Sequence, residues 1–344
     1  MLTGEIRSQV DRVWDAFWTG GISNSLEVIE QVTYLLFIKR LDEIHTRDLA
    51  RANRLHRPLE KPLFPAGVYI ELADESATAG AEPKKRPVTY DDLRWTRFKD
   101  LEARAMYQLI TQAVFPFVKS LGSEESAFAI HMRDARFTLP PEKAGLLAKV
   151  VEIIDKIPME DRDTKGDLYE YMLSKLAQAG QNGQFRTPRH IIKLMVEMVA
   201  PSPKDEICDP ACGTAGFLVA AAEYLDAHHK ELYSDDTLRA RYNGPMFHGF
   251  DFDSTMLRVA TMNMLLHGVE RPDIANRDSL SEDHGGVEEQ FTLLLANPLP
   301  FLEDLGCQQH HAAEGLPGRG VACREMVDLD CPFQEGCDES SRKG

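Results

Sequence analysis

Residues 209–218 read Asp209-Pro210-Ala211-Cys212-Gly213-Thr214-Ala215-Gly216-Phe217-Leu218, and this stretch decides the fold. An apolar lead, Ile207 and Cys208, precedes it, and an apolar, Ala-rich segment follows it. The order predicts a strand, a glycine loop and a helix. Glycines at such a junction let the backbone pass near a ligand, and the new helix presents unpaired N–H groups. We therefore expect a nucleotide-type cofactor at this loop, although many helix-capping turns look similar.

The sequence around this loop alternates between strand and helix patterns. Strands are expected near Ile207, over Met246–Phe250, near Ile274 and over Phe291–Ala296. Helices are expected over Pro188–Val199, with Thr187 as N-cap, over Phe217–Tyr224, and over Ser254–Leu266, with Gly268 as its stop. Alternation of this kind makes a parallel sheet with helices on both faces. The predicted fold class is therefore α/β, with a Rossmann-like, doubly wound sheet.

The preceding part of the chain has a helical pattern. Apolar residues recur at steps of three and four over Ile6–Trp18, Ser25–Leu41, Leu101–Leu121 and Glu142–Ile157. The segment from Pro58 to Pro87 is rich in Pro, Ala and charge, which predicts an irregular crossing. We expect an all-helical N-terminal domain over residues 1–155, a catalytic domain over 156–301 and an irregular segment over 302–344.

Composition limits the function classes. The 344 residues carry 39 Lys and Arg against 55 Asp and Glu, a formal net charge of −16. A protein that binds DNA without a partner usually has a basic face. This chain therefore either does not contact nucleic acid or relies on a partner subunit to bind it. Solubility alone explains the charge equally well. No apolar run approaches a membrane span and the N-terminus lacks a signal region, so we expect a cytoplasmic protein with no membrane contact.

Carboxylates follow the predicted strands in order. Asp209 ends the first strand, Asp251 the second, and Asp278 follows the third. In open α/β sheets the ligand lies beyond the carboxyl ends of the strands. There Asp209 would hold the amino-acid part of a cofactor, Asp251 the ribose hydroxyls and Asp278 the adenine amino group. Each Asp by itself is equally expected as a helix cap or turn residue.

The Asp-Pro-Ala-Cys-Gly-Thr-Ala-Gly-Phe string closely resembles the S-adenosyl-L-methionine loop of N6-adenine DNA methyltransferases, most closely the modification subunits of type I restriction–modification systems. A second string, Gln184-Phe185-Arg186-Thr187-Pro188, resembles the family segment that closes over the methionine end of the cofactor. The resemblance implies that Phe185 packs on the ligand and that Thr187 binds its carboxylate. The full cofactor-binding set is then Phe185, Thr187, Asp209, Ala211, Gly213, Thr214, Gly216, Asp251 and Asp278.

The reaction is assigned to the end of the fourth strand, which in this family reads Asn-Pro-Pro-Phe or a near variant. An adenine amine is a poor nucleophile because its lone pair is delocalised into the ring. The Asn297 side-chain oxygen and the Pro298 carbonyl would accept its two hydrogens, while an aromatic residue stacks on the flipped base. Here the sequence departs from the family, because Pro300 stands where the aromatic belongs and Phe301 follows one residue late.

Beyond Pro298 the resemblance ends. Residues 302–344 contain Cys307, Cys323, Cys331 and Cys337 without any helical or strand periodicity. Zinc, with His310 and His311 as further ligands, is disfavoured because no Cys-x-x-Cys pair is present, and we predict no metal site. Our hypothesis is a shifted reading frame just after Pro298. We accordingly expect a methyltransferase sheet that is incomplete at its C-terminal end.

The resemblance implies a site-specific adenine-N6 DNA methyltransferase, the modification subunit of a type I complex, in which S-adenosyl-L-methionine methylates a flipped adenine. Its partners would be a specificity subunit and a restriction subunit, with double-stranded DNA contacted through the complex. The N-terminal domain would contact DNA and these partners. Two alternatives stay open. One is protein glutamine-N5 methylation, which uses a similar Asn-Pro turn, and the other is a non-catalytic cofactor- or partner-binding remnant, favoured by the altered turn.

Overall fold

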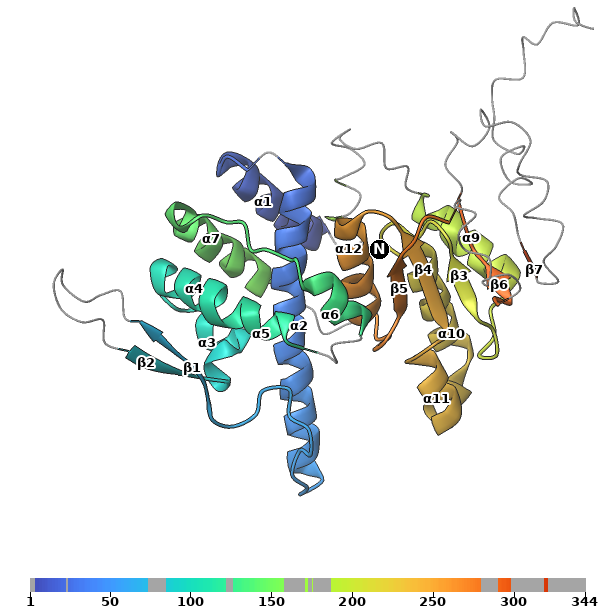
Figure 1. Cartoon of the computed structure of the whole chain (residues 1–344), viewed down its shortest axis with the longest axis horizontal. Helices are drawn as coiled ribbons and strands as arrows, with labels where there is room; N and C mark the ends of the chain where they lie inside the picture. The colour runs from blue at the N-terminus through green and yellow to red at the C-terminus, as the bar shows by residue number, and fades with distance from the viewer. Residues whose placement is uncertain are drawn as a thin grey trace, which may run out of the picture. The chain divides into compact units, whose positions relative to one another are not determined.

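The computed structural model describes residues 4–22, 24–73, 85–121, 126–157, 171, 172, 175, 187–279 and 290–297, and the backbone of Arg319 and Gly320. The chain divides by its contacts into two units (Figure 1). Unit 1 combines Met1–Arg186 with Asp253–Pro272, and unit 2 combines Thr187–Phe252 with Asp273–Gly344. Among the described residues, no helix is both long enough and apolar enough to cross a membrane.

Unit 1 is built around one long helix, α2 (Ser25–Arg54) (Figure 1). The helix begins at Asn24, whose side chain accepts hydrogen bonds from the N–H groups of Leu26 and Glu27. It continues well past the expected end at Leu41. Among its described residues, this unit also contains α1 (Gly4–Thr19), α3 (Trp95–Phe98), α4 (Ala103–Leu109), a π-helical turn (Ile110–Val114), α5 (Phe115–Lys119), α6 (Ala127–Met132), α7 (Ala144–Asp155) and α12 (Ser254–Leu266), together with 3-10 turns at Asp91–Leu93 and Pro141–Lys143.

A two-stranded antiparallel sheet makes the expectation of an all-helical N-terminal domain wrong. Strand β1 (Val68–Ala73) pairs with β2 (Lys85–Thr89), and Ile70 lies opposite Val88. The sequence Val-Tyr-Ile-Glu-Leu has the β-branched and aromatic content of a strand. The Pro- and charge-rich context concealed that signal, since Pro87 lies inside β2, a position that an edge strand tolerates.

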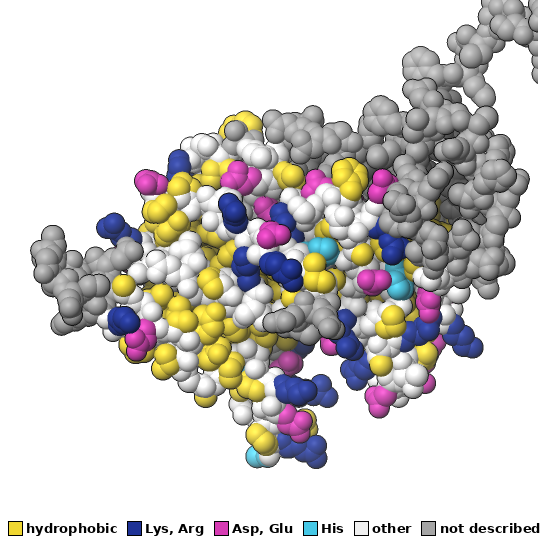
Figure 2. Space-filling view, viewed as in Figure 1, with side chains coloured by type: hydrophobic (Ala, Val, Ile, Leu, Met, Phe, Trp, Pro, Cys, Tyr) yellow, Lys and Arg dark blue, Asp and Glu magenta, His cyan; other side chains and the backbone are white. Residues whose placement is uncertain are grey.

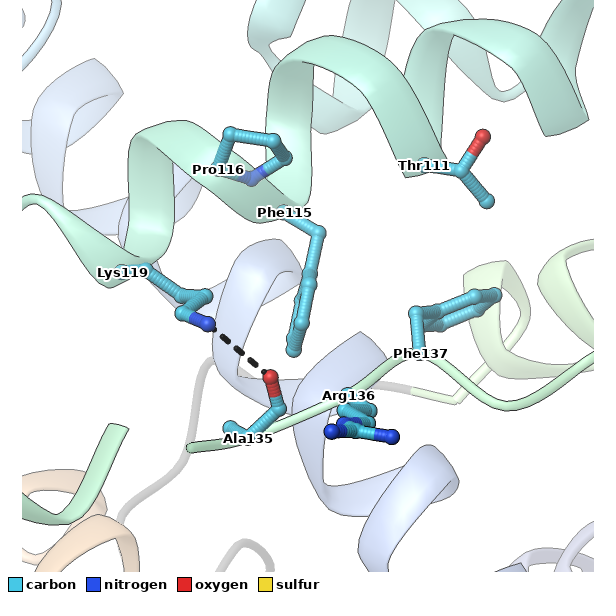
Figure 3. A pocket seen from close by; sticks show the side chains of 7 residues that line it. All are labelled: Thr111, Phe115, Pro116, Lys119, Ala135, Arg136 and Phe137. Carbon is cyan, nitrogen blue, oxygen red and sulfur yellow. Dashed lines mark hydrogen bonds between the residues drawn. The ribbon is translucent and has the colours of Figure 1, made fainter. Parts of the chain in front are cut away.

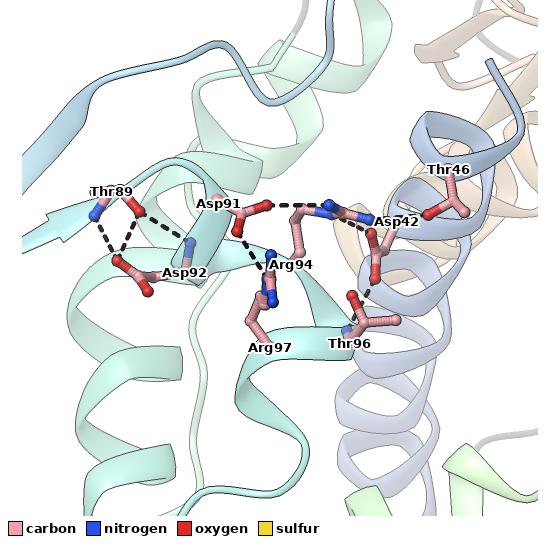
Figure 4. Close-up of polar contacts among 8 residues, drawn as sticks. All are labelled: Asp42, Thr46, Thr89, Asp91, Asp92, Arg94, Thr96 and Arg97. Carbon is pink, nitrogen blue, oxygen red and sulfur yellow. Dashed lines mark hydrogen bonds and ion pairs between the residues drawn. The ribbon is translucent and has the colours of Figure 1, made fainter. Parts of the chain in front are cut away.

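Charged side chains inside unit 1 are paired with one another (Figure 4). Asp42 of α2, with 3% of its side chain exposed, accepts hydrogen bonds from Arg94 Nε at 2.6 Å and from the Thr96 N–H at 2.8 Å. Arg94 also donates to Asp91 at 3.0 Å. Lys39, likewise buried, donates from Nζ to the carbonyl oxygens of Ile154, Asp155 and Ile157 at the end of α7. These particular polar groups therefore satisfy one another across distant parts of the sequence.

Unit 2 contains a parallel sheet, as the sequence predicts. Its strands are β3 (Ile207–Asp209), β4 (Phe247–Asp251), β5 (Asp273–Asn276), β6 (Leu293–Leu294) and β7 (Arg319–Gly320), in the spatial order β5-β4-β3-β6-β7. The chain thus places β4 and β5 on one side of β3 and then reverses to place β6 on the other. This is the strand order of a doubly wound α/β sheet. The backbone of β7 lies within residues 302–344, of which nothing else is described.

Helices α9 (Arg189–Val199), α10 (Gly216–His228) and α11 (Asp236–Tyr242) belong to unit 2. α10 packs on β3 and β4, and α9 packs on α10. The predicted cap of α9 is wrong by one residue, because Pro188 is the N-cap and makes no side-chain cap bond. Helix α12 begins and ends where the sequence predicts, although its Val259, Met262 and Leu266 are part of the core of unit 1.

Candidate active site

The predicted site residues gather at the carboxyl ends of the strands in unit 2. Asp209 lies opposite Gly249, and Asp251 opposite Asn276, so the parallel register brings these strand ends to one edge. β6 pairs with β3 on the other side, and Asn297 follows β6 by three residues. The strand order reverses between β3 and β6, and ligands of such sheets bind in the crevice at that reversal.

The glycine loop between β3 and α10 is held by backbone contacts. Gly213 has a φ of +51° and its N–H donates to Asp251 Oδ2 at 3.0 Å. The Cys212 N–H donates to the Phe250 carbonyl at 2.9 Å. The N-cap of α10 is Ala215 with a φ of 64°, a left-handed conformation that costs a residue with a Cβ some strain. The loop is therefore fixed against β4 before any ligand arrives.

Asp209 is buried, with 2% of its surface exposed. Its Oδ1 accepts the Ala211 N–H at 3.1 Å, and among the described residues no basic side chain pairs with it. Burial raises the pKa of this carboxyl to about 7, and the nearby charge of Asp251 acts in the same direction. Asp209 thus holds the loop through its bond to Ala211, and burial favours the protonated form of its carboxyl.

Thr187 and Asn297 lie 110 positions apart in the sequence and touch each other. Asn297 Nδ2 donates to Thr187 Oγ1 at 2.8 Å. No donor to Asn297 Oδ1 and no acceptor for the Thr187 hydroxyl hydrogen is found among the described residues. One residue predicted for the cofactor and one predicted for the reaction are therefore in direct contact, and both keep a free polar atom.

The remaining predicted residues are distributed as follows. Asp278 is exposed beyond β5, and the neighbouring Ser279 hydroxyl donates to the Pro210 carbonyl at 2.5 Å, which ties this segment to the glycine loop. Ala211 is exposed, Thr214 is half-buried, and Gly216 begins α10. Phe185, Pro298 and Phe301 lie outside the described residues.

Two residues of this edge escaped the sequence-based assignment. Phe252 follows Asp251 directly and is 78% exposed, which is unusual for a phenylalanine. Gly249 is needed for packing, because a Cβ there would stand 2.8 Å from Ile274 Cδ1 and 3.0 Å from Cys212 Sγ. The string Gly-Phe-Asp-Phe-Asp contained both signals, an apolar residue between two acids and a glycine within a strand.

A pocket in unit 1 contains none of the predicted residues (Figure 3). It has a volume of about 530 Å³ and is lined by Thr111, Phe115, Pro116, Lys119, Ala135, Arg136 and Phe137. The Lys119 side chain lines the pocket, and its Nζ donates a hydrogen bond to the Ala135 carbonyl at 3.0 Å. Its lining includes the basic side chains of Lys119 and Arg136 but no residue that the sequence assigns to the cofactor or the reaction, so we place the candidate active site at the strand ends.

Comparison with known proteins indicates the family of the chain. The N-6 DNA Methylase family matches residues 160–314, and the HsdM N-terminal domain matches residues 6–154. The chain is 29% identical to the type I restriction enzyme EcoEI methylase subunit of Escherichia coli over 235 residues, which are 65% of this chain and 46% of that protein. It is 35% identical to the EcoKI methylase subunit of Escherichia coli strain K12 over 132 residues, 37% of this chain and 23% of that one. The chain thus spans less than half the length of these curated relatives.

Solved structures support the fold. A chain from a study of complex assembly and conformational transition of the type I restriction–modification system aligns with a TM-score of 0.60 and 22% identity, covering 86% of this chain and 55% of that one. A modification subunit assigned to a type I restriction enzyme of Vibrio vulnificus YJ016 aligns with a TM-score of 0.63 and 23% identity, covering 87% and 61%. At this identity the likeness concerns the fold alone.

The parallel sheet and the two domain matches place the chain in the N-6 DNA Methylase family. Because the helical N-terminal match is that of the HsdM subunit, the class can be narrowed further. The chain belongs to the family of methylase, or modification, subunits of type I restriction–modification systems.

Proposed function

We propose that this chain transfers a methyl group from S-adenosyl-L-methionine to the N6 amine of a flipped adenine in DNA, as the modification subunit of a type I complex. The observation that carries the proposal is Asn297, which follows β6 beside the glycine loop of β3 and keeps Oδ1 without a donor among the described residues. An acceptor oxygen at the strand-order reversal is what an amine substrate requires.

The residues of the loop fit the cofactor. No atom of the described residues lies within 4 Å of the point where a Cβ would stand on Gly213, so they leave space for a ligand at this point of the loop. Asp251 would accept hydrogen bonds from the ribose, and Asp278 from the adenine amino group. The exposed ring of Phe252, next to Asp251, would cover the flat face of the nucleoside. Asp209 would supply negative charge for the cofactor's ammonium group, which lacks another counter-ion in this loop.

The chemistry follows from the acceptors of the chain itself. When bound, the cofactor supplies an electrophilic methyl group. Asn297 Oδ1 and the Pro298 carbonyl would accept the two N6 hydrogens, which holds the amine and directs its lone pair away from the ring plane. Phe301 would stack on the base, one position later than the family pattern provides.

Partners are part of the proposal. Acidic and basic side chains are intermixed on the face of the described residues in Figure 2, without a continuous basic stripe. Together with the net charge of −16, this favours DNA contact through a complex with a specificity subunit and a restriction subunit. In such an arrangement the helical unit 1 would provide contacts to DNA and to these subunits.

Radiolabelled methyl transfer tests the proposal. The chain is incubated with labelled cofactor and an adenine-containing duplex, with and without a specificity subunit, and in parallel with a peptide that carries a glutamine amide. Label in adenine that requires the specificity subunit is the expected result. Label in the peptide would instead support glutamine methylation. Cofactor binding without transfer to either substrate, even with the partner present, would identify a non-catalytic remnant.

A further inference from the structure

We infer that Thr187 is a positioning residue for methyl transfer, because its hydroxyl oxygen orients the Asn297 carboxamide so that Oδ1 faces the substrate amine. This inference rests on the proposed function and deepens it. The contact that carries it is the 2.8 Å hydrogen bond from Asn297 Nδ2 to Thr187 Oγ1. A carboxamide has an acceptor end and a donor end, and only the acceptor end can hold an N–H of the substrate.

The direction of this bond depends on which group accepts the hydroxyl hydrogen of Thr187. A hydroxyl has one hydrogen and two lone pairs, and no acceptor for the Thr187 hydrogen is found among the described residues. An anionic oxygen of the cofactor would accept that hydrogen. Only a lone pair then faces Asn297, and a carboxamide turned by 180° would set oxygen against oxygen. Cofactor binding and the orientation of Asn297 are thereby coupled through a single side chain.

Thr187 is itself held in place by the helix that follows it. Arg189 pairs with Glu223 of α10 at 3.2 Å. Ile192 Cδ1 lies 3.3 Å from the point where a Cβ would stand on Gly216, so α9 and the start of α10 are in close contact. Both contacts fix the start of α9 against the helix that the glycine loop begins. A side chain one residue before α9 is therefore well placed to align the loop with Asn297.

The Thr187 hydroxyl does not cap helix α9. The N-cap of this helix is Pro188, and no side chain caps it. Thr187 Oγ1 makes one hydrogen bond to a described residue, and that residue is Asn297. Removing the hydroxyl should therefore change the orientation of Asn297 more than the stability of the helix.

The test compares Thr187→Val, which keeps the shape and loses the hydroxyl, with Thr187→Ser, which keeps the hydroxyl. Each variant is assembled with the specificity subunit, and kcat on an adenine duplex is measured at saturating cofactor. We expect Thr187→Val to lower kcat about 10- to 100-fold, as for a lost hydrogen bond to a reacting group, and Thr187→Ser to stay within about threefold of the parent. Thr111→Val, a matched change in unit 1 at another half-buried threonine, is the control and should leave kcat unchanged.

Two further measurements separate this role from cofactor binding and from the proposed function. In an Asn297→Ala background, Thr187→Val should lower kcat no further, because it acts through Asn297. An equal loss in both backgrounds, or a loss of cofactor affinity in calorimetry with kcat unchanged, overturns the inference.

The second measurement does not depend on activity: the ¹⁵N-labelled Asn297 amide should exchange its hydrogens slowly in the parent and in Thr187→Ser, and quickly in Thr187→Val. If that exchange is equal in all three proteins, the positioning role is wrong even where methyl transfer occurs. If the exchange differs but no methyl is transferred, the proposed function fails and the contact stands.

Discussion

Two buried aspartates, one in each unit, differ in the partners that surround their carboxyl groups. Asp42 in unit 1 and Asp209 in unit 2 are each 2% exposed. Asp42 has a guanidinium and a backbone N–H as partners, whereas Asp209 has one backbone N–H and a second carboxylate, Asp251, nearby. The first arrangement is complete within the protein. The second has no cation among the described residues.

The same contrast extends to the surroundings of each group. Lys39, Arg94 and Arg258 of unit 1 all have their partners inside that unit. In unit 2 the left-handed Ala215, the exposed Phe252 and the free oxygen of Asn297 have no evident structural benefit among the described residues. Unsatisfied polar groups and strained backbone concentrate where a protein meets its ligand. For these particular groups, the contrast is between contacts completed inside the protein and groups left open at the strand ends, and four substitutions test it.

Asp42→Ala should have the largest effect. Removing Asp42 leaves Arg94 with Asp91 alone and the Thr96 N–H without its acceptor. We expect a cost of about 3 kcal/mol, the lower end of the range for breaking a buried pair. All three tryptophans, Trp14, Trp18 and Trp95, lie in unit 1, so urea denaturation followed by tryptophan fluorescence reports on this unit. A loss below about 1 kcal/mol would mean that the pair is not the structural element that Figure 4 suggests.

Asp209→Asn should raise the free energy of unfolding, whereas Asp42→Ala lowers it. The folded state holds the proton of Asp209 up to a pKa of about 7, whereas the unfolded chain loses it near the ordinary value of 3.8. Stability from this group is therefore fully present below about pH 4 and is lost as pH rises to about 7. An asparagine at position 209 does not titrate, so this loss of stability with rising pH disappears, while its side-chain oxygen can still accept the Ala211 N–H. Relative to the parent, the variant should gain about 2–3 kcal/mol between pH 5 and pH 8. The gain is measured by hydrogen exchange of β3 and β4 amides in both proteins at each pH, and equal protection at the two pH values would contradict the buried, unpaired state.

Gly249→Ala should cost about 1–3 kcal/mol, because the new Cβ would overlap Ile274 and Cys212 and push the glycine loop off β4. Gly145→Ala is the matched control within helix α7, where no atom lies within 4 Å of the added Cβ. That change should stabilise unit 1 by about 0.5–1 kcal/mol. Thermal denaturation of the two variants measures both effects, and a Gly249 variant as stable as the parent would show that the loop is not held against the sheet.

Ala215→Gly should have the smallest effect. Its φ of 64° strains an alanine, and glycine relieves the strain while adding freedom to the unfolded chain. The net gain should be below about 1 kcal/mol, seen as a small rise of the denaturation midpoint of unit 2. A clear loss would show that the alanine methyl, which is fully buried, contributes more through packing than it costs in strain.

Much of the fold could be predicted because its signals are local. Strand, glycine loop and helix follow one another at residues 207–228, and α12 was predicted with the right bounds. The hairpin of unit 1 was missed because its strands are short and flanked by Pro- and charge-rich sequence. Thr187 was assigned to a helix cap because local rules favour it there, whereas its hydroxyl bonds to Asn297 instead. Local propensity cannot reveal a partner 110 residues away.

The succession of strands and helices, the glycine loop and the carboxylates after the strands could be read from local sequence, since each depends on residues close in the chain. The burial and raised pKa of Asp209, the room that Gly249 leaves for Cys212 and the contact of Thr187 with Asn297 became visible only in the folded unit. These properties depend on which strands become neighbours. Neighbours in a sheet are chosen by packing over the whole unit, so no single segment of the sequence contains them.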